Sequence, residues 1–585
     1  MFKKSVKTTQ QTLFSSTNSL LKGRSLKVYE DNNKWHNQFR VQVTLRIDEE
    51  PFRVLFCEDF GSPNAPIRVL LGMMILKEAH GWSDAQLFEE TRFNLLTRSA
   101  LNYVNVDDAT PADSTYYKLR SRIVNHEKAG HENLLEKVFS QVTKSQALEF
   151  NINGKKTRMD SKLLGSNIAW YSRYELIHES IRLAYNILQP SIDRFLDESD
   201  IKFLKEIQSE SGDKVSYRSN KAEIETKLAQ LGSIIFKIIS HIGDNSSDCI
   251  QTLRRVFNEQ YQVVEDTISA RPKQEISAQS VQSPHDTDCH YRKKDDKQTK
   301  GYSINVMETC DEAVSQEVTE ENNSEVTEED NNKIKPLNLI TCVQVEAASV
   351  ADCDFLESAI EATKQIITKE VETVNADGAY HSQENQDYCK ENGIDLVIGA
   401  IQGKPSRYDL TQDKNGQLTV TDLTTNTEVE VRKVESRKEG TEPKWAIKTK
   451  DNKNRYFTQK EIDTCSLRKQ IASRPQADLN RRNNVEASIF QLGYHYPNNK
   501  SRYRGLIKHK MWANVRCLWV NFVRVLNFVA GGGYKCEQKV KNQAVLPVFL
   551  LIFVKMRFAM LLGENFLPVS PQVDFWGAVF ENDFL

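Results

Sequence analysis

The chain of 585 residues has few cysteines and no long apolar run. Its ten cysteines include no pair with the CxxC spacing, so a disulfide scaffold or a zinc ribbon is not expected and a reducing cytosol fits best. The most hydrophobic stretch, residues 544–562, is interrupted by Lys555 and Arg557. It is therefore too charged to serve as a membrane span of about 20 apolar residues. The basic N-terminus also lacks the apolar segment of a signal peptide. We expect a cytoplasmic protein without a membrane partner.

An excess of charge of one sign is also missing, because 78 Lys and Arg nearly balance 80 Asp and Glu. The overall balance therefore indicates no partner, but charge is unevenly distributed along the chain. Residues 311–330 contain nine acidic residues and no Lys or Arg, which is typical of a solvated loop. Residues 474–541 contain 13 Lys and Arg against 3 Asp and Glu. This basic region favours contact with a polyanion.

The first part of the chain predicts helices. Residues 1–50 are polar and weakly patterned and are expected to form an arm. Residues 51–150 are expected to form an all-α domain, in which Ser83 begins a second helix and residues 111–114 precede a third. The first of these helices has apolar residues near the three-and-four spacing of an amphipathic helix, namely Val69, Leu70, Met73, Met74 and Leu76.

The rest of the chain predicts an α/β sheet that carries insertions. A short strand is expected to end at Asp160, and later strands and helices alternate as in a sheet with crossover helices. The later strand-like runs are residues 301–307, 337–345, 371–376 and 394–400, with helices at 351–370 and 382–392. Residues 172–268 predict a helical insertion, and residues 404–458 an antiparallel β insertion with Asn-Gly and Asp-Asn turns.

Three carboxylates are candidates for catalysis. Asp160 and Asp377 follow strand-like runs, and Glu486 lies on a helix with Arg482 one turn before it. Taken singly, an Asp before Gly is usually a turn residue, and a Glu beside an apolar stripe is usually a solvated flank. Taken together with the basic region, the three are suited to hold two divalent cations on a phosphodiester, because carboxylate oxygens are the ligands that Mg²⁺ prefers.

These motifs resemble the DDE transposases of bacterial insertion sequences. The segment RMDSKLLGSNIA (158–169) resembles the first acidic motif, and NADGAYHS (375–382) the second. The segments SPHDTD (283–288) and KGYSINV (300–306) are similar to the family's entry into its second strand. The segment RNNVE (482–486) is similar to part of the signature Tyr-x2-Arg-x3-Glu-x6-Lys, with Leu479 in place of Tyr and Gly493 in place of Lys. RYRG (502–505), Asn521 and the N-terminal helices also fit this family.

The resemblance implies a ribonuclease-H-like catalytic core in residues 151–530, followed by a C-terminal tail in residues 531–585. It implies that Asp160, Asp377 and Glu486 are the catalytic residues and bind two Mg²⁺ ions, for which Mn²⁺ can substitute. The implied partner is DNA, both the inverted-repeat ends and the target duplex. The resemblance also implies that further copies of the chain form a dimer or larger assembly on DNA, in a bacterial cytoplasm and associated with the nucleoid. The residues expected to bind DNA phosphates are Arg482, Lys500, Arg502, Arg504, Lys508 and Lys510.

Two other functions stay open at this point. The chain could be a metal-dependent nuclease of the same fold without strand transfer, or an inactive protein that only binds transposon ends. The aromatic residues within the basic region also have two interpretations, because they could stack on bases or pack in the core. We expect packing for Trp512 and leave Tyr494, Tyr496 and Tyr503 open.

Overall fold

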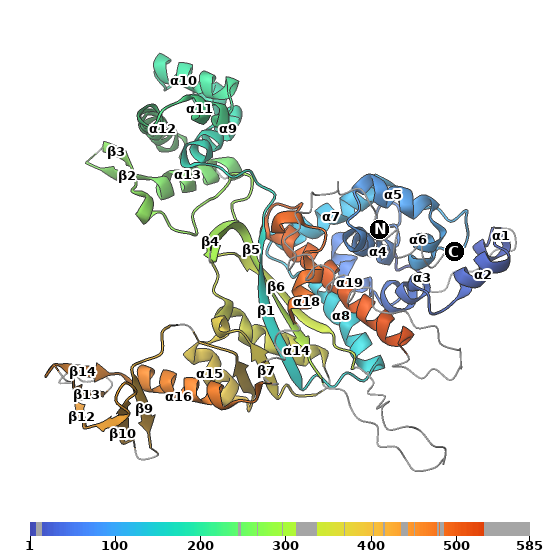
Figure 1. The fold of residues 1–585 in the computed structure, drawn as a ribbon. Coiled ribbons are helices and arrows are strands. Elements are labelled where there is room, and N and C mark those ends of the chain that lie inside the picture. The colour runs from blue at the N-terminus through green and yellow to red at the C-terminus, as the bar shows by residue number, and fades with distance from the viewer. Residues whose placement is uncertain are drawn as a thin grey trace, which may run out of the picture.

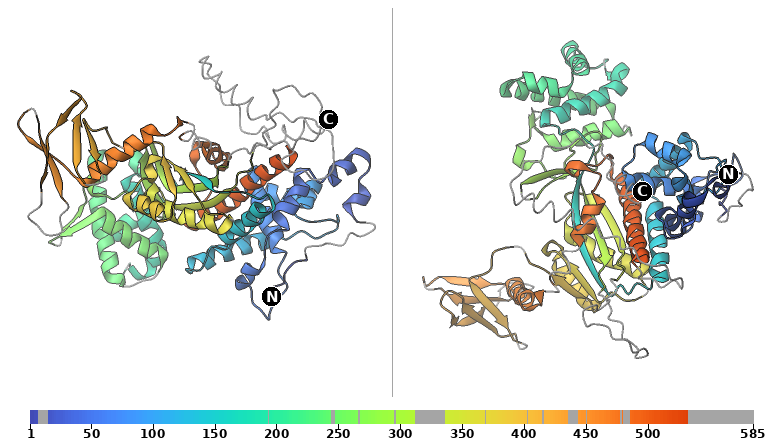
Figure 2. Two further views of the ribbon diagram at one scale, coloured as in Figure 1. Left: turned by 90° about the horizontal axis from the view of Figure 1, so that it is seen from below. Right: turned by 45° about the vertical axis from the view of Figure 1, so that its right-hand side comes forward.

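The computed structural model describes residues 1–6, 15–192, 194–243, 247–265, 267–294, 296–311, 336–367, 369–401, 403–413, 416–434, 443–449, 451–476, 479 and 485–531. A central sheet has helices packed around it, and two lobes project from it (Figures 1 and 2). One lobe is helical and the other consists mainly of β-strands. No helix within the described residues is long and apolar enough to cross a membrane.

The central sheet mixes antiparallel and parallel strands. Its middle strand, β1, pairs antiparallel with β5 on one side and parallel with β7 on the other. β5 also pairs antiparallel with β4 and β6, and β7 pairs parallel with β8. The bounds are β1 Lys156–Gly165, β4 His290–Lys294, β5 Lys297–Thr309, β6 Ile340–Ala347, β7 Thr373–Ala376 and β8 Asp395–Ile398. The α/β class and the four later strands of the prediction are confirmed.

One detail of the strand prediction is wrong, because Asp160 does not end its strand. β1 continues to Gly165, since residues 157–165 all pair with β5. The pairing with β7, in contrast, is recorded only from Lys156 to Arg158. The long partner strand therefore keeps the chain extended beyond Asp160.

Helices cover both faces of the sheet. Met307 and Glu308 are neighbours in β5, so their side chains point to opposite faces. Met307 contacts Thr363 of α14 (Leu356–Ile366), whereas Glu308 is bonded to Arg524 of α19 (Leu506–Ala530). The short helix α18 (Val485–Leu492) lies on the α19 face, and α15 (Gln383–Glu391) connects β7 to β8. The expected helices at 351–370 and 382–392 are thus confirmed.

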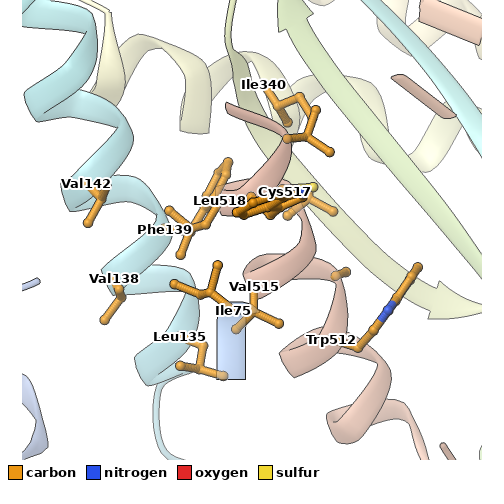
Figure 3. Close-up of a cluster of buried hydrophobic side chains, with 14 of the residues drawn as sticks. Ile75, Leu135, Val138, Phe139, Val142, Ile340, Trp512, Val515, Cys517 and Leu518 are labelled. Atoms are coloured by element: carbon orange, nitrogen blue, oxygen red, sulfur yellow. The ribbon is translucent and has the colours of Figure 1, made fainter. Parts of the chain in front are cut away.

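The N-terminal helices are α4 Ile67–His80, α5 Asp84–Phe93, α6 Leu95–Ala100, α7 Asp113–Lys128 and α8 Leu134–Glu149. Of these, α4, α7 and α8 pack directly on α19. Ser83 begins α5 through reciprocal capping bonds with Gln86, as expected. The close-up in Figure 3 shows Leu135 and Phe139 of α8 beside Val515 and Leu518 of α19. These contacts belong to one hydrophobic core that continues into the central sheet.

The prediction that the first helix is amphipathic is wrong. Every residue of α4 from Ile67 to Ala79 is buried, because α19, α5 and the segment before α4 pack around it. That segment is the expected polar arm, residues 1–50, and it contains helices α1 Thr17–Leu20, α2 Gly23–Glu30 and α3 Trp35–Phe39. Phe39 is fully buried, and its ring lies 5.1 Å from that of Phe522.

The two lobes correspond to the expected insertions. The helical lobe has its own hydrophobic core and contains α9 Arg173–Ile192, α10 Glu198–Ser209, α11 Gly212–Arg218, α12 Lys221–Ile242 and α13 Asp248–Gln260. Its end differs from the prediction, because residues 261–270 form a hairpin of β2 Tyr261–Val264 and β3 Thr267–Ala270.

The β lobe confirms the antiparallel insertion and consists of two three-stranded sheets. They contain β9 Tyr408–Gln412, β10 Leu418–Asp422, β11 Thr427–Val429, β12 Val431–Val434, β13 Lys444–Lys448 and β14 Asn454–Phe457, and α16 Gln459–Ser473 follows. Other predicted segments lie outside the described residues: the acidic loop beyond Asp311, the apolar run 544–562 and the tail from residue 532.

Candidate active site

Asp160 lies in β1, and Asp377 directly follows the neighbouring parallel strand β7. The last recorded pair of β1 and β7 is Arg158 with Asn375, and Asp160 and Asp377 each lie two residues beyond it in the sequence. Side chains alternate along a strand, so Asp160 lies on the face of β1 that carries Arg158. Asp160 accepts a hydrogen bond from the Ser161 N–H at 2.8 Å, and Asp377 accepts one from the Gly378 N–H at 2.6 Å.

Gly378 explains why the chain turns directly after Asp377. A Cβ atom at this position would overlap the carbonyl oxygen of Ala400 and would lie 2.8 Å from its carbonyl carbon. Only glycine allows this approach of the backbone after β8. The turn continues as a short 3-10 helix, 378–380, for which Asp377 is the N-cap.

A buried tyrosine lies close to both aspartates. The Tyr380 hydroxyl donates a hydrogen bond to Asn305 Oδ1 at 2.6 Å. Burial raises the pKa of Tyr380 well above its ordinary value, and the carboxylates of Asp352, Asp160 and Asp377 raise it further. The hydroxyl therefore stays protonated and supports the turn that follows Asp377.

Glu486 is exposed and lies near the start of α18. The expected apolar side of this helix is confirmed for Val485 and Leu492, which are buried. Ser488 donates a hydrogen bond to Glu308 Oε2 at 2.6 Å, and Lys162 Nζ lies 3.4 Å from the carbonyl oxygen of Ile489. Because Lys162 is two residues from Asp160 on β1, α18 lies over the face that carries Asp160.

The three candidates are not gathered into one tight cluster. Within the described residues, no group of three or more His, Cys, Asp or Glu could hold a metal ion. Asp160 lies in β1, Asp377 directly follows β7, and Glu486 belongs to α18. Arg482, which the sequence suggests as its partner, lies outside the described residues.

A buried charge cluster that the sequence analysis missed fixes α18 to the sheet. Glu308 has no exposed side-chain surface and is bonded to Arg158, Arg524 and Ser488. Burial acts to raise the pKa of Glu308, but Arg524 and Arg158 outweigh it and the pKa is lowered. The sequence places Glu308 after Val306 and Met307, but its pairing opposite Arg158 comes only from the antiparallel register of β1 and β5.

The basic candidates differ in their surroundings. Lys500, Arg502, Arg504 and Lys508 are exposed. Three of them donate to main-chain carbonyls: Lys500 to Ile168 at 2.8 Å, Arg504 to Asn167 at 2.6 Å and Arg502 to Gly81 at 2.8 Å. Neutral carbonyls do not cancel these charges. Lys510 differs, because it forms an ion pair with Glu346 at 2.9 Å.

The aromatic residues of this region mostly pack. Trp512 is 2% exposed, which confirms the expectation for it. Tyr496 is buried, and the hydroxyls of Tyr496 and Tyr503 both donate to the carboxylate of Glu78. Tyr494 is 36% exposed and thus remains accessible to solvent.

An α/β protein with one aspartate in its middle strand, another directly after the parallel neighbour and a set of exposed basic side chains is suited to act on a phosphodiester. Residues 27–122 match the family described as Transposase domain (DUF772), and residues 334–522 match the family described as Transposase DDE domain. The two matches support a DDE transposase of the insertion-sequence type. A search of curated proteins found no match.

The matched segments include only part of the candidate site. The DDE match contains Asp377 and Glu486, whereas Asp160 lies between the two matched segments. The first match begins at residue 27, within the segment expected to be a polar arm. The assignment of Asp160 therefore depends on its position beside Asp377.

Proposed function

We propose that this transposase binds the inverted-repeat ends of an insertion sequence, cleaves the DNA and joins the freed 3′ end to a target duplex. Asp160, Asp377 and Glu486 are the catalytic residues in this proposal. The observation that carries it is the parallel pairing of β1 with β7, in which Asp160 and Asp377 each follow the last pair, Arg158 with Asn375, by two residues. The match to a Transposase DDE domain supports the reaction class.

We further propose that the core is ribonuclease-H-like. Its support is the order of the strands: β1, β5 and β6 are successively antiparallel, and β7 and β8 then add parallel to β1 on its other edge. Helices connect the parallel strands, as such connections require. The helical lobe enters between β1 and β5 in the chain, and the β lobe follows β8.

DDE transposases generally depend on a divalent metal, and the donors of this site suit Mg²⁺. Two carboxylates from adjacent strands offer the hard oxygen ligands that Mg²⁺ prefers. In the proposal Asp160 and Asp377 hold two ions, and Glu486 joins them when DNA is bound. A pair of ions about 3.5–4 Å apart would activate water and stabilise the leaving oxygen.

The exposed basic residues would position the DNA backbone. Lys500 and Arg504 bond the loop after β1, and Arg502 bonds the junction of α4 and α5, so these side chains are ordered near the strand of Asp160. Phosphate contacts fix the register of a duplex without reading its sequence. We include Arg482, Lys508 and Lys510 among these phosphate-binding residues. We also propose that the active form is a dimer or a larger assembly on DNA.

The experiment uses the full chain, Mg²⁺ and labelled DNA that carries the inverted repeats flanking the gene. Cleavage at the ends followed by joined products is the expected result. Cleavage without joining would instead indicate a nuclease, and specific binding without cleavage would indicate an end-binding protein. Either of these two results would contradict the proposed strand transfer.

A further inference from the structure

Lys162 lies in the strand of Asp160 and reaches the end of α18. Side chains at alternate positions of a strand share a face, so Lys162 and Asp160 lie on the same face of β1. The ammonium of Lys162 lies 3.4 Å from the carbonyl oxygen of Ile489. Ile489 is in α18, the helix that carries Glu486. Lys162 therefore lies between the strand of one candidate carboxylate and the helix of another.

The charge of Lys162 is not matched by an opposite charge nearby. Among the residues that the structure describes, no carboxylate lies within 4.0 Å of its ammonium. Arg158, on the same face of β1, is instead bonded to the buried carboxylate of Glu308. Keeping a half-buried cation without an anion costs free energy, and this cost is offset when an anion binds. On a protein that acts on DNA, the natural anion is a backbone phosphate.

Gly493 leaves the space that Lys162 occupies. A Cβ atom built on Gly493 would lie 2.9 Å from Cε of Lys162 and still closer to its Nζ. The signature that this chain resembles has a lysine at position 493. Here an ammonium reaches the same place from β1 instead of from the segment after α18.

We propose that Lys162 is a DNA-binding residue of the active site, whose ammonium contacts a backbone phosphate from the place where a lysine at position 493 would act. This inference rests on the proposed function, because the ligand is the DNA that the site cleaves. It assigns a role in the reaction to a residue of β1 and explains how the chain tolerates glycine at position 493.

A purely structural role for Lys162 makes a different prediction. Cations near the C-terminal end of a helix stabilise it by about 0.3–1 kcal/mol, and Ile489 is in the last turn of α18. Under that explanation, loss of the charge lowers stability and leaves DNA binding unchanged. Thermal unfolding and the salt dependence of binding therefore separate the two roles.

The test compares full-length variants in Mg²⁺-dependent cleavage of end DNA. Lys162→Met keeps most of the side-chain stem, and we expect it to cleave roughly 100-fold more slowly. Its binding should lose about 0.9 from the slope of log affinity against log salt, which corresponds to one phosphate contact. The control is Lys155→Met, which removes a lysine directly before β1 that pairs with Glu372. The control should cleave and bind like the original chain.

The decisive variant moves the lysine from position 162 to position 493. Gly493 does not have a left-handed backbone, so a side chain is allowed there once Lys162 is shortened. We expect Lys162→Ala with Gly493→Lys to recover most of the cleavage that Lys162→Ala loses. Normal cleavage by Lys162→Met would overturn the inference, and so would a folded double variant that cleaves no better than Lys162→Ala.

The proposed function is tested separately by the original chain and by Asp160→Ala. If the original chain does not cleave, the proposed function fails, and the salt slope of Lys162→Met still decides whether Lys162 contacts DNA. An unchanged slope in that variant contradicts the inference. A reduced slope supports it.

Discussion

Glu308 is a single side chain on which the position of a helix depends. It is fully buried and bonded to two arginines and to Ser488 of α18. Removing one charged partner from a buried ion cluster leaves the other charges uncompensated. The resulting loss in free energy of unfolding is much larger than the loss for an ion pair at the surface. Glu308 thus connects the strand pair β1 and β5 to the helix that carries Glu486.

We predict that Glu308→Gln destabilises the protein by about 3–5 kcal/mol, because Arg158 and Arg524 lose the fully buried carboxylate to which both are bonded. Urea unfolding measures this change. The matched control is Glu361→Gln, which removes a half-exposed glutamate paired with Lys364 and should have little effect. Similar stability losses in the two variants would show that the cluster has no special role.

The catalytic prediction also concerns single residues. Asp160→Ala, Asp377→Ala and Glu486→Ala should each abolish cleavage and leave binding of end DNA nearly intact, because carboxylates hold the metal and basic residues hold the DNA. Gel-based cleavage and binding assays measure the two properties. A variant that cleaves like the original chain identifies a residue that is not a metal ligand.

At the scale of elements, the acidic segment connects two well-bonded strands. β5 and β6 are paired from Tyr302 to Glu308, and Asp311 accepts a hydrogen bond from the Gly154 N–H at 2.8 Å. Asp311 is thus part of the packed structure, although it begins the acidic run 311–330. A deletion that tests the segment should therefore begin at residue 312.

We predict that deletion of residues 312–330 shifts the melting temperature little. The segment has too few apolar residues to form a core, and the closure entropy of a loop changes slowly with its length. Thermal unfolding measures the shift, and deletion of residues 311–330 is the matched comparison. A large loss of stability in the shorter deletion would show that the segment packs.

At the scale of the whole molecule, the N-terminal helices and the catalytic sheet share one hydrophobic core. α19 contacts both α4 and β6, so its packing connects the region matched by the first family to the region matched by the second. Separate fragments would expose this interface. DNA binding is therefore best tested on the full chain.

We predict that Arg502→Gln combined with Arg504→Gln weakens binding to every duplex alike. Phosphate contacts carry no sequence information, and the slope of log affinity against log salt should fall by about 0.9 for each phosphate that the variant no longer neutralises. Binding titrations with end DNA and random DNA at several salt concentrations measure both effects.

The control for this prediction removes the same charge from the helical lobe. Arg218→Gln with Lys221→Gln changes side chains that are 67% and 93% exposed, and it should leave the slope unchanged. A folded Arg502/Arg504 variant with an unchanged slope would mean that these arginines act only through the carbonyls of Gly81 and Asn167.

Stability should fall as the solution becomes acidic. Burial lowers the pKa of His80 to about 3, assisted by His495 and Arg516. Burial also lowers the pKa of His495 to about 4, assisted by Arg516 and Arg502 and opposed by its bond to Ala79. An unfolded histidine titrates near pH 6.5, so between about pH 6.5 and 4 the unfolded chain binds more protons and the folded state loses stability.

Melting temperatures at pH 7.5 and pH 5 measure this loss. His495→Asn should reduce the difference between the two values, because one buried neutral histidine is removed. His241→Asn, which changes an exposed histidine of the helical lobe, should leave the difference unchanged. If the melting temperature changed equally with pH in the original chain and in both variants, His495 would not be a cause of the loss of stability.

Much of the fold could be predicted because it depends on local patterns. The strand runs, the cap at Ser83 and the turn at Asp377-Gly378 are each decided within a few residues, by side-chain periodicity, capping bonds and the space at glycine. The order of the acidic motifs along the chain indicated the family, and the family matches agree.

Only the tertiary structure decided which of these elements meet. Asp160 stays within a strand because β5 extends beyond it, and α4 is buried all around because α19 packs against it. Lys162 reaches α18 across 327 positions of sequence. The sequence by itself therefore determined the elements and the motif residues, whose causes are local. The tertiary structure determined their partners, because contacts between distant residues depend on how the whole chain packs.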